Sequence, residues 1–214
     1  MNVVIVGTGG HGKVVLDILQ CTTAVKVVGF IDDDPSFQGR IINGLPVLGN
    51  TNSLLQLIQK YNIEGAIIAI GNRKIRAVLF EKAVEMGLKL INAIHPSAVI
   101  ARNVKMGDGV MIVAGAVINT DSKIGDDVII NTGATVDHDN IIGKHVNIQP
   151  GVSLGGIVTI KAYTEVGIGA TVIQNISIGE GSTIAAGAAI ITDVPDNVTV
   201  VGVPGRIVRE DKPE

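Results

Sequence analysis

The order of apolar and polar residues along the chain changes character near residue 92. Before that point, short apolar runs alternate with stretches in which apolar residues recur at helical spacing. These patterns predict strands at 3–6, 27–31, 46–48, 66–70 and 88–91 and helices at 12–20, 52–61 and 73–86. Strands that alternate with helices are typical of a parallel sheet with right-handed crossovers. Residues 1–92 are therefore predicted to form an α/β, Rossmann-like domain.

From residue 93 onward the pattern has a period of six residues. Every sixth residue from Ile100 to Ile190 is aliphatic, and most residues two places earlier are small or β-branched. A period of six fits neither a helix nor an isolated strand. It is typical of short parallel strands wound into a coil, in which each strand points one aliphatic side chain inward. Residues 93–214 are therefore predicted to form an all-β domain, a parallel β-helix. The tail 198–208 is expected to cover the unpaired edge of its last coil.

The composition agrees with this division and excludes several classes of function. Only 2% of the 214 residues are aromatic and 27 are glycines, which favours a core of small, branched side chains. A formal net charge of -3 offers no basic surface for nucleic acid. Cys21 is the single cysteine, which excludes an intrachain disulfide and a cysteine-rich metal cage. Because neither a signal peptide nor an apolar stretch of about 20 residues is found, we expect a cytoplasmic protein without membrane contact.

A glycine-rich loop, residues 7–13, lies between the first predicted strand and the first predicted helix. Its sequence GTGGHGK contains the G-x-G-x-x-G pattern of dinucleotide-binding loops, and Asp32 and Asp33 end the second strand. Glycine lets the backbone approach a phosphate, and the helix N-terminus attracts its charge. The domain is too short for the second half that would hold a nicotinamide, which argues against an NAD-dependent enzyme. We therefore predict a phosphate-bearing ligand shorter than a dinucleotide.

The candidate ligand-binding residues of this region are Gly9, Gly10, His11, Lys13, Asp32 and Asp33. The two glycines leave room for the backbone to approach the phosphates. The histidine and the lysine supply hydrogen-bond donors to a diphosphate, unless they are ordinary solvent-facing residues. The two acids accept hydrogen bonds from a base or a ribose, unless they serve only to cap a helix or form a turn.

His138 lies inside the six-residue repeat, in the segment TVDHDN, with an acid on either side. Acyl transfer from a thioester to an amine needs a base, and histidine titrates near neutral pH. An adjacent carboxylate can fix the tautomer of such a base and stabilise its charged form. A metal site is not expected, because adjacent residues on a strand point to opposite faces. Of the other histidines, His95 is expected to make a structural hydrogen bond and His145 to lie on the surface.

Four motifs occur in order along the chain: GTGGHGKVV, FIDDD, IHPSAVI and VDHDN. With this set, residues 1–208 resemble the bacterial nucleotide-sugar acetyltransferases that N-acetylate UDP-4-amino-sugars or GDP-perosamine, and the related sialic acid O-acetyltransferases. The hexapeptide repeat resembles the left-handed parallel β-helix of acyltransferases. The resemblance implies a homotrimer with active sites between subunits, acetyl-CoA as co-substrate and no metal. It also implies that the nucleotide-sugar binds the N-terminal domain, with its diphosphate near the glycine loop and its base near the acidic pair.

The resemblance assigns roles to single residues of the repeat. His138 matches the catalytic histidine of the family and Asp139 its acidic partner, with Asp137 as the alternative partner. Gly155 and Gly156 match glycines that lie along the pantetheine arm and use an N–H group to stabilise the oxyanion. The predicted cofactor groove further contains Ala186, Pro204, Arg206 and Asn147, the last in place of a second histidine that many relatives have.

These features predict an enzyme that uses acetyl-CoA to acetylate the amino group of a nucleotide-linked sugar, for surface polysaccharide or glycan synthesis. Two alternatives stay open at this point. The same fold can acetylate a sugar hydroxyl, as in sialic acid O-acetyltransferases, or it can hold a nucleotide-sugar as a scaffold without chemistry.

Overall fold

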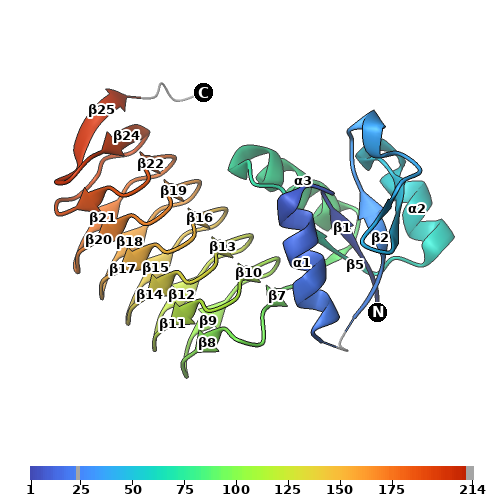
Figure 1. Ribbon diagram of the computed structural model, residues 1–214, viewed down its shortest axis with the longest axis horizontal. Helices are drawn as coiled ribbons and strands as arrows, with labels where there is room; N and C mark the ends of the chain where they lie inside the picture. Colours follow the sequence, from blue (N-terminus) through green and yellow to red (C-terminus); the bar gives the residue numbers. More distant parts are fainter. Residues whose placement is uncertain (23–24, 211–214) are drawn as a thin grey trace. The chain divides into compact units, whose positions relative to one another are not determined.

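The computed structural model describes residues 1–22 and 25–210. The chain divides into two compact units, Met1–Ile94 and His95–Glu214 (Figure 1). Within the described ranges, every helix is too short or too polar to cross a membrane.

The first unit is a mainly parallel β-sheet whose strands are connected by helices. The strands are β1 (Asn2–Val6), β2 (Lys26–Ile31), β3 (Ile41–Ile42), β4 (Leu45–Gly49), β5 (Gly65–Ile68) and β6 (Lys89–Leu90), and β7 (Ala93–Ile94) ends the unit. The helices are α1 (Gly10–Gln20), α2 (Leu54–Tyr61) and α3 (Arg73–Glu85), with 3-10 turns at Pro35–Phe37 and Thr51–Ser53. The strand order β3-β4-β2-β1-β5-β6 confirms the predicted Rossmann-like fold, because the order reverses at β1.

The apolar pattern of the sequence does not predict β3, which pairs antiparallel with β4. Asn43 and Gly44 join the two strands, and both have left-handed backbone, with φ angles of 46° and 83°. An Asn-Gly pair between apolar residues is the strongest short sequence signal of a hairpin. That signal identifies β3, whereas the apolar run Ile41–Ile42 is too short to predict a strand by itself.

Side chains from the sheet and the helices form the core of the first unit. Val4, Ile31 and Ile68 from three neighbouring strands pack with Leu57 of α2 and Phe80 of α3, and all five are buried. This packing holds the carboxyl ends of β1, β2 and β5 at one edge of the sheet, where the loops that follow these strands meet.

The second unit is a stack of coils, each made of three two-residue strands (Figure 1). One face carries β10 (Met111–Ile112), β13 (Ile129–Ile130), β16 (Asn147–Ile148), β19 (Glu165–Val166) and β22 (Thr183–Ile184). The next face carries β8 (Val99–Ile100), β11 (Val117–Ile118), β14 (Thr135–Val136), β17 (Ser153–Leu154), β20 (Thr171–Val172) and β23 (Ala189–Ile190). The third face carries β9 (Lys105–Met106), β12 (Lys123–Ile124), β15 (Ile141–Ile142), β18 (Thr159–Ile160) and β21 (Ser177–Ile178). Each strand pairs in parallel with the equivalent strand of the next coil, as β10 does with β13 and β11 with β14, which confirms the predicted β-helix.

One residue of each strand points into the coil, at the predicted spacing of six. From Ile112 to Ile190 all of these inward side chains are buried. Ile100 and Met106, in the first coil, are only partly buried, because β8 and β9 lie at the ends of their sheets. The buried column stabilises the unit, since each Å² of apolar surface removed from water contributes roughly 25 cal/mol.

Each coil turns three corners, and each corner contains a residue with left-handed backbone. At the corner before β14 and its equivalents this residue is a glycine: Gly115, Gly133, Gly151, Gly169 and Gly187. At the corner after β14 and its equivalents the residues are Asn103, Asp121, Asp139, Ile157 and Asn175. Asn and Asp tolerate this conformation better than other side chains, and a β-branched residue such as Ile157 is an outlier there.

The prediction that His145 lies on the surface is wrong. Its side chain is fully buried, its Nδ1 atom lies 2.9 Å from Asp127 Oδ2, and its ring stacks on Tyr163 with 4.9 Å between the centroids. These three residues occupy the third corner in successive coils, all with left-handed backbone, so the register of the coil brings them together. His95 makes the expected structural contact, because its Nδ1 atom accepts a hydrogen bond from Ser97 N at 3.0 Å.

The C-terminal tail extends one face of the stack. β24 (Val198–Val201) pairs in parallel with β22, and β25 (Arg206–Glu210) pairs antiparallel with β24. The tail therefore covers the edge of the last coil, as predicted from the sequence.

Replacing Ile130 by alanine is expected to lower the free energy of unfolding by about 2–5 kcal/mol, because the side chain is fully buried and its loss leaves a cavity. Thr135→Ala, at an exposed position of the next strand, is expected to change that free energy by less than about 0.5 kcal/mol. Urea denaturation followed by circular dichroism measures both changes. Equal losses in the two variants would contradict the assignment of Ile130 to the interior.

Candidate active site

The first unit contains a cavity of about 490 Å³ at the carboxyl ends of its central strands. Its polar lining includes Gly9, Gly10, His11, Asp32 and Asp33, and its apolar lining includes Ile31, Ile70 and Leu79. In open α/β sheets a ligand binds at this edge, where the strand order reverses. The structure thus brings five of the six predicted ligand-binding residues to one cavity.

Asp32 and Asp33 each hold a neighbouring segment by hydrogen bonds. The Asp32 carboxylate accepts hydrogen bonds from Thr8 N at 2.7 Å and from Thr8 Oγ1 at 2.5 Å, and its other oxygen accepts one from Asp34 N at 2.9 Å. The Asp33 carboxylate accepts hydrogen bonds from Thr51 N at 2.7 Å and from Thr51 Oγ1 at 2.9 Å. The acids therefore shape the cavity and form a turn, a role that the sequence left open. Their contact with a base or a ribose stays a prediction.

Helix α1 begins directly after the glycine loop and packs closely against it. A Cβ atom on Gly12 would overlap the carbonyl oxygen of Gly7, so only glycine fits there. Gly9, at the N-cap, has no side chain to bond the first N–H groups of the helix, which leaves them for an anion. Lys13 is exposed and is not among the described residues that line the cavity.

Burial, together with the positive charge of Arg76, lowers the pKa of His11 from 6.5 to about 4. Arg76 is fully buried in α3 and donates a hydrogen bond from Nη1 to Ile70 O at 3.1 Å. At pH 7 His11 is therefore neutral. It can donate or accept a hydrogen bond in the cavity, but it brings no charge to a diphosphate.

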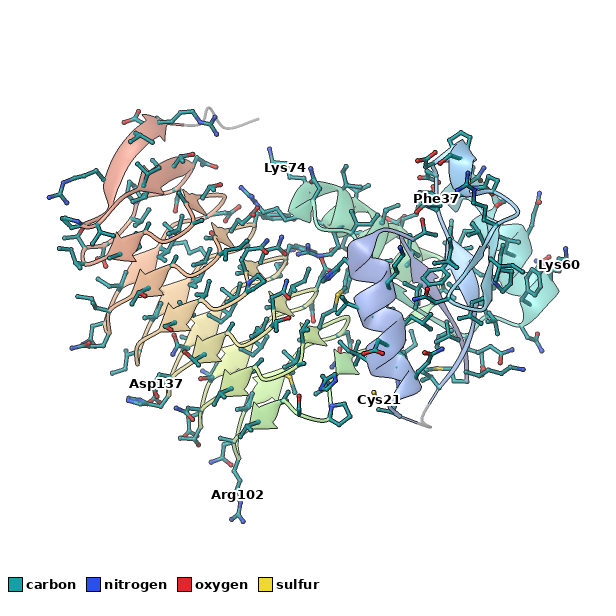
Figure 2. All side chains as sticks on the ribbon, viewed as in Figure 1. Cys21, Phe37, Lys60, Lys74, Arg102 and Asp137 are labelled. Atoms are coloured by element: carbon teal, nitrogen blue, oxygen red, sulfur yellow. The ribbon has the colours of Figure 1, made fainter. Side chains whose placement is uncertain are left out.

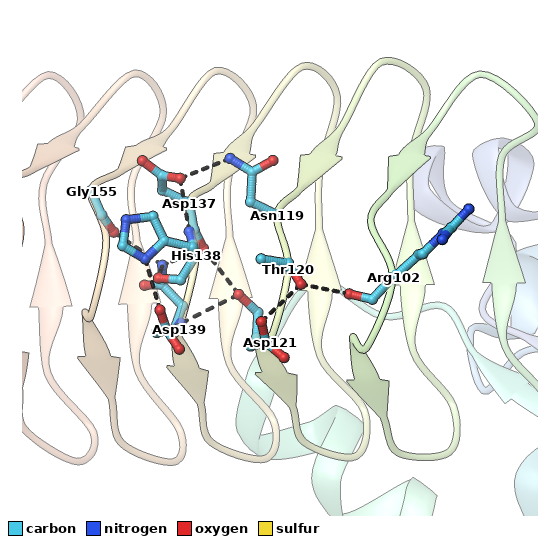
Figure 3. A network of polar contacts seen from close by, with 10 residues as sticks. Arg102, Asn119, Thr120, Asp121, Asp137, His138, Asp139 and Gly155 are labelled. Atoms are coloured by element: carbon cyan, nitrogen blue, oxygen red, sulfur yellow. Dashed lines mark hydrogen bonds and ion pairs between the residues drawn. The ribbon is translucent and has the colours of Figure 1, made fainter.

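His138 lies at the corner between β14 and β15, and its side chain is 49% exposed (Figure 3). Its Nδ1 atom lies 2.8 Å from Asp139 Oδ2. Asp137 is bound elsewhere, because its Oδ1 atom accepts hydrogen bonds from His138 N at 2.8 Å and from Asn119 Nδ2 at 2.7 Å. Asp137 and Arg102, at the same corner of different coils, both point outward (Figure 2). The geometry therefore favours Asp139 as the partner of the imidazole.

The charges around His138 favour its protonated form. The hydrogen bond with Asp139 raises the pKa of His138 above 6.5, and the negative charges of Asp137 and Asp139 add to this effect. The hydrogen bond from Asn119 lowers the pKa of Asp137, so that carboxylate stays ionised. An imidazole whose Nδ1 atom donates to a carboxylate keeps Nε2 as the proton acceptor.

Gly156 lies directly against the His138 ring. A Cβ atom on Gly156 would lie 2.7 Å from both Nε2 and Cε1 of that ring, so a side chain there would displace it. The N–H group of the preceding glycine, Gly155, donates to Val172 O at 2.9 Å within the sheet. Among the described residues, Gly156 N has no hydrogen-bond acceptor. The backbone donor that remains beside the imidazole therefore belongs to Gly156.

The other predicted cofactor residues lie on other faces of the same chain. Asn147 is buried in β16, and Ala186 is exposed at the corner between β22 and β23. Pro204 and Arg206 are exposed in the C-terminal tail. Within one chain, the structure thus joins His138 with Asp139, Gly155 and Gly156 but not with these four residues, whose role stays a prediction.

Asn119, which holds the Asp137 side chain, is not among the residues predicted from the sequence. The two residues are one coil of the β-helix apart, so they occupy equal positions of neighbouring coils. The coil length that follows from the six-residue repeat is the signal that identifies such a contact. A groove of about 660 Å³, lined by Lys105, Lys123 and Asp139 among others, extends from the same corner.

Comparisons with known proteins agree with this description. Residues 2–83 match the family described as PglD N-terminal domain. A histidine-to-alanine variant of GDP-perosamine N-acetyl transferase from Caulobacter crescentus, in complex with CoA and GDP-perosamine, is 39% identical. That match covers 97% of this chain and 96% of the other, with a TM-score of 0.89. The chain belongs to the nucleotide-amino-sugar N-acetyltransferases.

Two further members of this family extend the comparison. The acetyltransferase domain of PglB from Neisseria gonorrhoeae, in complex with acetyl coenzyme A, is 37% identical over 97% of this chain and 98% of that chain, with a TM-score of 0.87. UDP-N-acetylbacillosamine N-acetyltransferase from Bacillus subtilis is 38% identical over 119 residues, which are 53% of this chain and about half (51%) of that relative. The family confirms the resemblance seen in the sequence and the left-handed form of the β-helix.

The imidazole of His138 is expected to titrate above pH 6.5, because its hydrogen bond to Asp139 stabilises the charged form. Asp139→Asn removes that negative charge, so the pKa of His138 is expected to fall towards 6.5. NMR titration of the imidazole C–H signals measures both values. Asp121→Asn, at the equivalent position one coil earlier, is the control and is expected to leave the pKa of His138 unchanged. An equal effect of both substitutions would refute the special role of Asp139.

Proposed function

We propose that this protein transfers an acetyl group from acetyl-CoA to the amino group of a nucleotide-linked amino sugar, for surface polysaccharide or glycan synthesis. The observation that carries the proposal is the exposed imidazole of His138, bonded to Asp139 and lying against the bare backbone of Gly156. It is supported by relatives, similar over nearly the whole chain, that bind CoA with GDP-perosamine or acetyl coenzyme A. Since acetyl-CoA and nucleotide-sugars are cytoplasmic metabolites, we assign the protein to the cytoplasm.

In the proposed reaction, the unprotonated amine attacks the carbonyl carbon of the thioester. As the C–N bond forms, His138 Nε2 accepts a proton from the nitrogen, and Asp139 stabilises the imidazolium. The Gly156 N–H group donates a hydrogen bond to the oxyanion of the tetrahedral intermediate. When the C–S bond breaks, the thiolate of CoA leaves and takes the proton from Nε2. The imidazole is then ready for the next amine.

The cavity of the first unit is the proposed site of the nucleotide diphosphate. The uncapped N-terminus of α1 attracts the phosphates, and neutral His11 adds a hydrogen bond without a charge. The apolar wall formed by Ile31, Ile70 and Leu79 suits the faces of a base.

We infer that the protein is a homotrimer with active sites between neighbouring subunits. Large apolar side chains are exposed on the β-helix, as is typical of interaction surfaces: Ile141, Ile157, Ile168, Ile173 and Ile191. In a trimer, the predicted cofactor residues on other faces can approach the His138 of a neighbouring subunit. A monomer in sedimentation equilibrium at micromolar concentration would refute this inference.

His138→Ala is expected to lower kcat at least ~100-fold, the loss typical of a missing general base. Binding of CoA, measured by calorimetry, is expected to be retained, because the substituted side chain is exposed and the coil does not depend on it. The assay uses labelled acetyl-CoA with UDP- and GDP-linked amino sugars and with matching hydroxy-sugars. Turnover close to wild type would refute the mechanism.

His11→Ala serves as the comparison, since it removes a neutral hydrogen-bonding group from the nucleotide cavity. We expect KM for the nucleotide-sugar to rise up to about tenfold, equivalent to one hydrogen bond of about 1.4 kcal/mol, with kcat little changed. Acetylation of hydroxy-sugars alone would replace N-acetylation by O-acetylation as the function. Binding of both ligands without any turnover would instead support the scaffold alternative.

A further inference from the structure

Four polar residues interrupt a column of small apolar side chains in the β-helix. The column lies two places before each inward aliphatic residue, and the buried polar residues in it are Ser122, Asn140, Thr164 and Ser182. They form two pairs, and the members of each pair occupy equivalent positions of neighbouring coils. One pair lies at the His138 corner, and the other lies at the third corner of the coil.

The Asn140 side chain bonds the backbone on both sides of the gap between two coils. Its Nδ2 atom donates to Asp137 O at 2.6 Å and lies 3.3 Å from His138 O, both within its own coil. The same atom donates to Gly155 O at 3.0 Å in the next coil. Ser122 adds a hydrogen bond from Oγ to Asp137 O at 2.9 Å. The turn that carries His138 is thereby tied to the glycine pair opposite its ring.

Packing of the column alone does not explain an asparagine at this position. Val158 occupies the equivalent position one coil later and is fully buried. Asn140 Oδ1 is buried too, and among residues 1–22 and 25–210 it has no hydrogen-bond donor. A buried polar atom without a partner destabilises a protein, whereas an apolar side chain of similar size does not. The asparagine therefore has a benefit that lies outside the packing of the column.

We propose that Asn140 is a positioning residue of the acyl transfer, which fixes the His138 imidazole relative to the Gly156 N–H group. This inference rests on the proposed function. The base and the oxyanion donor belong to different coils, so their separation depends on how these coils are held at this corner. Acyl transfer is sensitive to errors of a fraction of an ångström in such a pair. The Asn140 amide sets that separation through its bonds to the carbonyls of Asp137, His138 and Gly155.

Asn140→Val tests the proposal, because valine already fits this column. We expect kcat to fall at least about tenfold, with KM for acetyl-CoA and for the nucleotide-sugar changed by less than about twofold. The matched control is Thr164→Val, which removes the same type of contact at another corner, since Thr164 Oγ1 donates to Gly179 O at 2.7 Å. The control is expected to keep its kcat. Equal kcat values in the two variants would overturn the proposal.

A second measurement does not depend on turnover. We expect Asn140→Val to lower the pKa of His138 towards 6.5, because the loosened turn weakens the bond between its ring and Asp139. Thr164→Val is expected to leave that pKa unchanged. An unaltered pKa in the first variant would also overturn the positioning role. Wild-type protein that lacks acetyl transfer would refute the proposed function alone, since the titration still reports on the turn.

Asn140→Ser provides a rescue and a safeguard against misfolding. Ser122 shows that a hydroxyl in this column reaches the Asp137 carbonyl. Asn140→Ser is therefore expected to restore part of the kcat lost in Asn140→Val. If the valine variant does not fold, the serine variant replaces it, and wild-type kcat and His138 pKa in the serine variant would then count against the proposal.

Discussion

The backbone ladder between coils is the constraint on which the second unit depends. Each two-residue strand inside the stack pairs with the equivalent strands of the coils before and after it, so residues one coil apart must stack. A corner side chain therefore has neighbours that its residue number identifies. Asn119 lies beside Asp137, and Asp127 lies beside His145. The coils have the same backbone, but equivalent positions in successive coils carry different side chains. These differences create the polar contacts of the unit.

This stacking resolves a conflict between exposure and order at His138. As the proposed base, the imidazole has to reach a ligand, and half of its side chain surface is in solvent. Its ring is nevertheless held by the hydrogen bond with Asp139, and its backbone N–H group by the hydrogen bond to Asp137. The absence of a side chain on Gly156 leaves room for the other side of the ring. The first unit differs, because its candidate groups lie at the ends of strands, where the N-terminus of α1 and neutral His11 are proposed to bind the ligand. One unit is thus suited to hold an anion, and the other to move a proton.

The sequence predicts most of the fold because its repeat is unbroken: the inward residues from Ile112 to Ile190 are buried as their spacing of six requires. The resemblance of the VDHDN segment also indicates the contact between His138 and Asp139, whereas adjacency alone does not distinguish Asp139 from Asp137. The repeat identifies which residues stack between coils, but it does not predict which of their polar groups form hydrogen bonds. Which N–H groups remain available depends on the pairing of the next coil, as with Gly155, and burial at a corner depends on the stacked side chains, as with His145.

The left-handed backbone of Asp139, with a φ angle of 57°, has a consequence for how this scaffold can change. Asparagine adopts that conformation as readily as aspartate, so the corner accepts either side chain without strain. Only aspartate at this position, however, adds the negative charge that helps to raise the pKa of the neighbouring His138. A single exchange of acid for amide therefore separates folding from reactivity. A descendant with that exchange could keep every coil and the cavity of the first unit while losing, in the proposed mechanism, the charge that stabilises its protonated base.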